Sequence, residues 1–81
     1  MTDIEVLMLD GCTKKEAEAH LLRGSSVIKG FEEFFDDYMQ QWGIDEEEVP
    51  VYKKMIEDKT PAPDWGVVEK DGETYYIMYC L

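Results

Sequence analysis

The chain contains few cysteines and no long hydrophobic run. Two cysteines, Cys12 and Cys80, are too few for a disulfide scaffold, so we expect both to be free thiols. No apolar stretch approaches the roughly 18 residues of a membrane-spanning helix. The chain opens with Asp3 and Glu5, where a secretory leader would carry positive charge. We therefore expect a cytoplasmic protein that does not bind a membrane.

Basic residues are scarce. Eight lysines and arginines stand against 19 aspartates and glutamates, for a formal net charge of -11. Eight of the acidic residues lie between Gly30 and Tyr52, where no lysine or arginine occurs. A surface of this kind repels phosphate backbones and anionic lipids. The charge therefore argues against direct nucleic-acid binding and leaves open a protein partner, including a basic one.

Catalytic and metal-binding motifs are also missing. Cys12 and the single histidine, His20, are separated by about 12 Å if both lie on one helix, too far for a nucleophile and its base to hydrogen bond. Cys12, His20 and Cys80 lack the spacing of a zinc site, and residues 45–48 lack the alternating ligands of a calcium loop. No phosphate-binding glycine loop occurs. We predict a protein that is not an enzyme and has no cofactor or metal.

The sequence does contain enough apolar residues for one small folded domain, residues 1–81. Hydrophobic residues make up 44% of the chain, too many for a disordered protein even at this net charge. A chain of this length buries only about 60 to 65% of its unfolded surface, so its core is small. We predict an α+β fold in which four helices pack on a C-terminal antiparallel β-hairpin.

Two N-terminal segments carry matching helix signals. Each opens with a threonine that is followed three residues later by a glutamate, the spacing of a capping box, and each ends at a glycine. These signals predict helices at residues 3–10 and 14–23.

The third segment has the clearest helical pattern. Its apolar residues recur at helical spacing, and they are Phe31, Phe34, Phe35, Tyr38, Met39 and Trp42. The positions between them are polar. The pattern predicts a helix at residues 30–42 with an aromatic face in the core and an acidic face in solvent.

A fourth helix is predicted near residues 46–59. Pro50 complicates its start, because proline lacks an amide hydrogen and is tolerated only in a first helical turn. The regular helix therefore starts either at Glu46 or only at Val49 or Pro50, after an acidic turn.

The C-terminal segments at residues 65–69 and 74–80 are rich in aromatic and β-branched residues. Between them, Asp71-Gly72 is typical of a primed turn, so we predict a β-hairpin. Both faces of its second strand are apolar, so both need cover. Residues 26–28 form a candidate third strand.

The order of these segments resembles that of a group of short, acidic, uncharacterised bacterial proteins, chiefly from Gram-positive gut species. The segments that carry the resemblance are Glu32–Trp42, Gly43–Glu48, Tyr52–Ile56, Asp64–Gly66 and Tyr75–Tyr79. The resemblance implies a cytoplasmic, bacterial, stand-alone domain. It implies no site residue.

These observations favour a non-enzymatic protein-interaction module, which could also form a homodimer through the hairpin. An alternative hypothesis is an acidic mimic of nucleic acid that inhibits a basic nucleic-acid-binding protein, and a third is a small thiol or metal-dependent enzyme. The candidate partner-binding residues are Glu32, Glu33, Asp36, Asp37, Trp65, Tyr76 and Met78.

Overall fold

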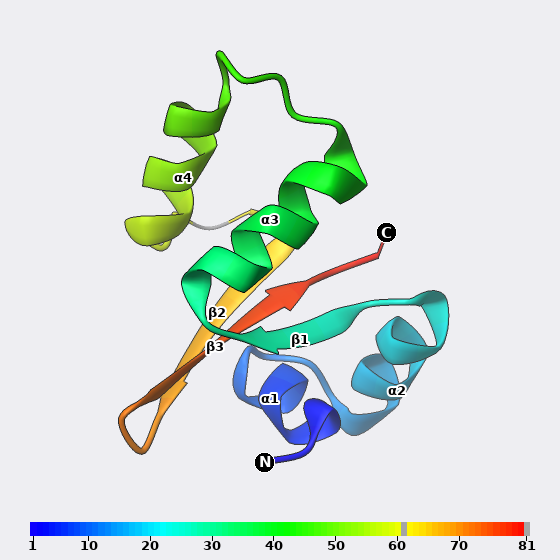
Figure 1. Ribbon diagram of the computed structural model, residues 1–81. Coiled ribbons are helices and arrows are strands. Elements are labelled where there is room, and N and C mark those ends of the chain that lie inside the picture. The colour runs from blue at the N-terminus through cyan, green and yellow to red at the C-terminus, as the bar shows by residue number, and fades with distance from the viewer. Residues whose placement is uncertain (61, 81) are drawn as a thin grey trace.

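A three-stranded antiparallel sheet lies between two pairs of helices in the computed structural model, which describes residues 1–60 and 62–80 (Figure 1). The helices are α1 (Asp3–Leu9), α2 (Lys14–Arg23), α3 (Phe31–Trp42) and α4 (Val49–Glu57). The strands are β1 (Ser26–Lys29), β2 (Trp65–Lys70) and β3 (Glu73–Met78), and their order in the sheet is β1-β3-β2. The predicted α+β fold, its C-terminal hairpin and its third strand are confirmed.

Capping boxes begin α1 and α2, as the sequence predicts. In the first, the Glu5 backbone N–H donates to Thr2 Oγ1 at 3.3 Å and the Thr2 N–H donates to Glu5 Oε1 at 3.0 Å. Thr13 and Glu16 form the same pair of bonds at 3.1 and 2.9 Å. Each box satisfies backbone donors that a helix N-terminus leaves without a partner. Glycines in left-handed geometry follow both helices and α3.

The start of α4 is decided by Pro50. The regular helix begins at Val49, with Pro50 in its first turn, and residues 46–48 form a turn instead. The prediction of a start at Glu46 is therefore wrong, and the alternative start at Val49 or Pro50 is right. A proline in the first turn costs nothing, because the amide hydrogen that it lacks would have had no partner within the helix.

The central strand is β3, because it pairs with β2 on one side and with β1 on the other. The turn that joins β2 to β3 has positive φ angles at Asp71 (52°) and Gly72 (80°), as in a primed turn. On the opposite edge of β3, Val27 lies across from Ile77. With a neighbour on each side and helices over each face, β3 has the cover that its two apolar faces require.

One face of the sheet packs against α1 and α2. Its buried cluster contains Val6, Leu7, Ala17, Val68, Tyr75, Ile77 and Tyr79. Leu7 and Ile77 are completely buried. The short N-terminal helices are therefore held by burial against the sheet, since helices of this length are marginal on their own.

The other face of the sheet packs against α3 and α4. Its buried cluster contains Phe34, Phe35, Tyr38, Ile56 and Trp65. The predicted aromatic stripe of α3 is thus largely in the core, but Trp42 differs because 46% of its surface is exposed. It is the last residue of α3, directly before Gly43, where the chain turns away into the segment that leads to α4 (Figure 1).

The capping box of α2 makes the stability of the protein dependent on pH. Hydrogen bonds from the Thr13 backbone and side chain hold the pKa of Glu16 below its ordinary value of 4.5. A carboxyl whose pKa is lowered on folding stabilises the protein above its unfolded pKa, and that stabilisation is lost as the pH falls through the folded pKa.

We predict that Glu16→Ala lowers the free energy of unfolding at pH 7 and that the difference from the natural protein shrinks below pH 4.5. Urea denaturation followed by circular dichroism at both pH values measures it. Glu18→Ala is the control, because it removes the same charge from an exposed position of α2. An equal loss in both variants at pH 7 would contradict the prediction.

Candidate functional site

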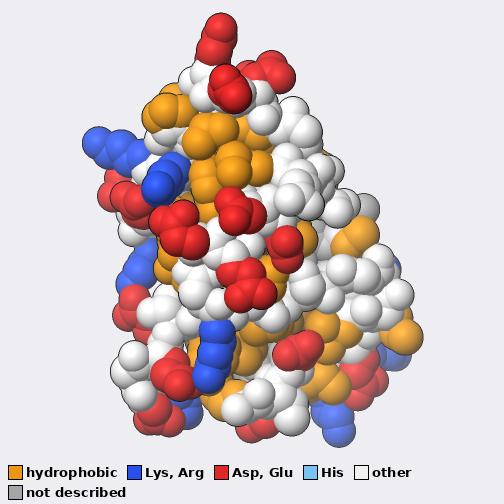
Figure 2. All heavy atoms as spheres, in the orientation of Figure 1, with side chains coloured by type: hydrophobic (Ala, Val, Ile, Leu, Met, Phe, Trp, Pro, Cys, Tyr) orange, Lys and Arg blue, Asp and Glu red, His pale blue; other side chains and the backbone are white. Residues whose placement is uncertain are grey.

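The four predicted acidic partner-binding residues of α3 lie in solvent. Glu32, Glu33, Asp36 and Asp37 are all exposed. Glu32 forms a loose ion pair with Lys53 of α4, with 3.7 Å between Nζ and Oε1. Acidic side chains are scattered over this face of the molecule and over the turn that precedes α4, at the top of the view (Figure 2).

The three predicted residues of the hairpin lie within the domain's own packing. Trp65 is 5% exposed, and its Nε1–H donates to the Thr60 carbonyl at 3.0 Å. The Tyr76 ring stacks on Phe34 at a centroid distance of 5.2 Å. Met78 packs against the same cluster. The large aromatic side chain that is exposed to solvent is instead Trp42, at the end of α3, for which the sequence predicts a position in the core.

Trp42 borders a cleft of about 260 Å³ between the C-terminal end of α3, the start of α4 and the turn before β2. Six of its lining residues carry aromatic rings or carboxylates: Tyr38, Trp42, Tyr52, Asp45, Glu48 and Asp64. We refer to this site as the Trp42 cleft.

The aromatic rings of the Trp42 cleft are arranged around Tyr38. Tyr38 and Trp42 are four residues apart on α3, so they share one face of the helix, and their ring centroids are 6.4 Å apart. Tyr52 reaches the same place from α4, with its centroid 6.1 Å from that of Tyr38. Both pairs are tilted, by 50° and 46°. Tyr38 is itself buried, so the ring surfaces open to the cleft are mainly those of Trp42 and Tyr52.

A partly buried hydrogen bond orients Tyr38 in this arrangement. Its hydroxyl donates to Asp64 Oδ2 at 2.8 Å. Burial, and then the bond to the Asp64 carboxylate, raise the pKa of Tyr38 well above its ordinary value. The hydroxyl therefore remains a proton donor throughout the neutral range, and it holds one carboxylate of the cleft in place.

The charge around the Trp42 cleft is entirely negative. Asp45, Glu48 and Asp64 line it, and none of its lining residues is basic. Within residues 1–60 and 62–80, no basic side chain forms an ion pair with these three carboxylates. No group of His, Cys, Asp or Glu side chains in that part of the chain is placed to hold a metal ion. Negative potential beside aromatic faces is the combination that attracts organic cations in general.

A second polar cluster lies on the opposite face of the sheet, around Tyr79. The Tyr79 hydroxyl donates to Asp10 Oδ2 at 2.5 Å, and Cys12 Sγ lies 3.8 Å from the same hydroxyl. Because the hydroxyl proton is directed to Asp10, the thiol is the donor in the second contact. The His20 ring packs edge-on against Tyr79 at a centroid distance of 4.9 Å, and its Nδ1 is buried without a partner within the described chain. Tyr79 therefore contacts both Cys12, the candidate nucleophile, and His20, the candidate base.

The Tyr79 cluster, which consists of Asp10, Cys12, His20 and Tyr79, stabilises the fold. Tyr79 is only 8% exposed, and burial followed by the bond to Asp10 raises its pKa far above the ordinary value. Asp10 lies so close to β2 that a Cβ atom on Gly66 would be 2.5 Å from Asp10 Oδ2. A side chain at position 66 would therefore have to displace the Asp10 carboxylate from this place. The cluster thus ties the C-terminal end of α1 to β2 and to the segment that follows β3.

Every helix in residues 1–60 and 62–80 is too short or too polar to span a lipid bilayer.

No pattern in the sequence predicts several of these contacts. Tyr38 and Asp64 are 26 residues apart, and Asp10 and Tyr79 are 69 apart. Helical spacing identified Tyr38 and Tyr52 as apolar positions, which is correct for their rings, but it says nothing about where a hydroxyl finds its acceptor.

We predict that Gly66→Ala and Asp10→Ala are not additive. Gly66→Ala alone forces Asp10 away from Tyr79, leaving a buried hydroxyl without its acceptor, and lowers the free energy of unfolding by about 1 to 3 kcal/mol. In the Asp10→Ala background the clash is gone, so the same substitution costs less. Denaturation of the single and double variants measures the coupling. Equal costs in both backgrounds would contradict the assigned role of Gly66.

Comparison with known proteins adds no relative from which a role could be transferred: no protein-family model matches the chain, and no curated protein or solved structure matches it significantly.

Proposed function

We propose that this domain is a non-enzymatic protein-interaction module and that the Trp42 cleft receives a lysine or arginine side chain of a partner protein. The observation that carries the proposal is the convergence of three aromatic rings and three carboxylates, without a basic residue, on one cleft.

The chemistry of the cleft matches a basic side chain in two respects. An ammonium or guanidinium group over the face of Trp or Tyr gains about 0.5 to 2 kcal/mol, depending on how far it is desolvated. The carboxylates supply the opposite charge, and Asp64 is already oriented by Tyr38. An organic cation in this site would therefore make both kinds of contact at once.

The size of the cleft also favours a single side chain. Pockets for drug-sized molecules occupy about 300 to 1,000 Å³, whereas this cleft measures about 260 Å³. Its contribution to affinity would then be one anchor within a larger contact. The exposed carboxylates of α3 would add long-range attraction, which acts mainly on the association rate and weakens as salt is added.

The alternative function, an acidic mimic of nucleic acid, places the binding surface elsewhere. It depends on the carboxylates of α3 at Glu32, Glu33, Asp36 and Asp37, and it needs no aromatic cleft. The two hypotheses therefore predict opposite results when the two sets of residues are neutralised separately.

We predict that a hexa-arginine peptide binds at the Trp42 cleft. Titration of the labelled domain should shift the indole N–H resonance of Trp42 and leave that of the buried Trp65 nearly unchanged. Trp42→Ala and, separately, Asp45→Asn with Glu48→Gln should each weaken binding about tenfold in calorimetry, because each removes one class of contact with the cation.

The matched control is Glu32→Gln with Glu33→Gln, which removes the same two charges from α3. It should weaken binding much less than the change at Asp45 and Glu48. The reverse order of effects would support the nucleic-acid mimic, and equal small effects would mean that the peptide binds only through net charge. Either result would reject the cleft as the site.

A further inference from the structure

Strand β2 is an edge of the sheet, and its register identifies the backbone groups that are free. Lys70 and Glu73 flank the two-residue turn and are paired across the hairpin. In an antiparallel ladder, hydrogen-bonded pairs alternate with non-hydrogen-bonded ones, starting from the pair beside such a turn. The N–H and C=O groups of Val67 and Glu69 therefore point away from β3, toward the open edge.

The backbone groups of Trp65 also point toward the open edge, but another part of the chain already lies against them. The chain before β2 folds back so that Ala62 bridges to Trp65. Strand β2 consequently offers two free residues, Val67 and Glu69, with Val68 between them.

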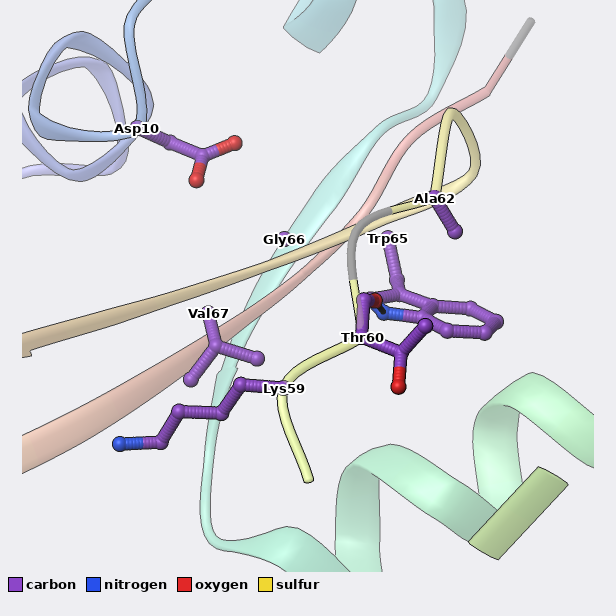
Figure 3. Close-up of a pocket in the computed structure, with 7 residues that line it drawn as sticks. All are labelled: Asp10, Lys59, Thr60, Ala62, Trp65, Gly66 and Val67. Carbon is purple, nitrogen blue, oxygen red and sulfur yellow. Dashed lines mark hydrogen bonds between the residues drawn. The ribbon is translucent and has the colours of Figure 1, made fainter. Parts of the chain in front are cut away.

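A groove of about 280 Å³ runs beside this edge. Asp10 reaches it from α1 on one side of β2, and Lys59 and Val67 lie on the other side (Figure 3). Gly66 lies between the two sides and adds no side chain. The backbone of β2 is thus open to another extended segment.

We propose that a second copy of this chain pairs with the open edge of β2, antiparallel and about a twofold axis at Val68, to form a continuous six-stranded sheet. This register places Val67 opposite Glu69 of the second copy, and Glu69 opposite Val67, so that the free backbone groups of both residues are used. A twofold axis at Val67 would place Glu69 opposite Trp65, whose edge is occupied by Ala62.

Charge complementarity on the helix α1 side favours the same register. Lys70 and Gly66 lie on that side of β2, two positions either side of Val68. The twofold axis at Val68 therefore brings Lys70 of each copy opposite Gly66 of the other, where the Asp10 carboxylate fills the space above the glycine. Two such lysine-aspartate contacts form per dimer.

Charge on the other side of the sheet is also balanced. Lys59 already forms an ion pair with Glu69 of its own chain, and Lys59 lies beside Val67. The register brings Glu69 of the second copy opposite Val67. Lys59 of each copy therefore has a Glu69 carboxylate from each of the two chains nearby. Two acidic and two basic side chains per copy meet at this edge, even though the whole chain carries a net charge of -11. The edge is therefore a part of the surface where two copies do not repel each other.

Sedimentation equilibrium of the full chain, from micromolar to millimolar concentration, tests the pairing. We expect a monomer-dimer equilibrium, and Lys70→Glu should raise the dissociation constant about tenfold or more, because it replaces two attractive contacts per dimer by repulsive ones. Lys54→Glu is the matched control. It makes the same charge change at an exposed position of α4 and should leave the equilibrium nearly unchanged.

Amide hydrogen exchange locates the contact independently of any substitution. The N–H groups of Val67 and Glu69 should exchange fast at low concentration and become protected as the concentration rises, whereas Val68 is protected at both. A chain that stays monomeric, or a dimer in which Val67 and Glu69 remain unprotected, would overturn the proposal. These outcomes are separate from those at the Trp42 cleft, which lies on a different surface and is tested with a peptide.

Discussion

The whole structure depends on a central strand that must be buried on both faces. Tyr75 and Ile77 point to one side of β3, and Tyr76 and Met78 point to the other. A single layer of helices would leave one of these apolar sets in water. The chain meets the requirement by placing α1 and α2 on one face and α3 and α4 on the other, so that an 81-residue protein has three layers.

This requirement also decides which aromatic residues remain for contact with other molecules. The aromatic side chains of the hairpin and most of those on α3 fill the two clusters. Three of them have a polar group that is bonded inside the domain, Tyr38 to Asp64, Tyr79 to Asp10 and Trp65 to the Thr60 carbonyl. Trp42 stays in solvent because α3 ends there, and the turn that follows brings carboxylates to its side.

The same three layers determine where the charge is located. The acidic residues of α3 alternate with its core positions, so they lie on the outer face, away from the sheet. Lysines are placed at the open edge of the sheet instead, where Lys59 pairs with Glu69 and Lys70 follows. The molecule therefore has an acidic cleft lined by aromatic side chains and, at the open edge of the sheet, a region where acidic and basic side chains lie together.

Local patterns in the sequence by themselves determined the elements of this protein. Capping boxes identified α1 and α2, helical periodicity identified α3, and the Asp-Gly turn identified the hairpin, because each is set by neighbours within a few residues. Pro50 acted locally too, because a proline is tolerated only in a first helical turn, and α4 begins at Val49. Only the tertiary structure decided that Trp42 is exposed and that Asp64 and Asp10 receive the hydroxyls of Tyr38 and Tyr79. These outcomes depend on contacts between residues far apart in the chain, and such contacts arise from packing the helices on both faces of β3.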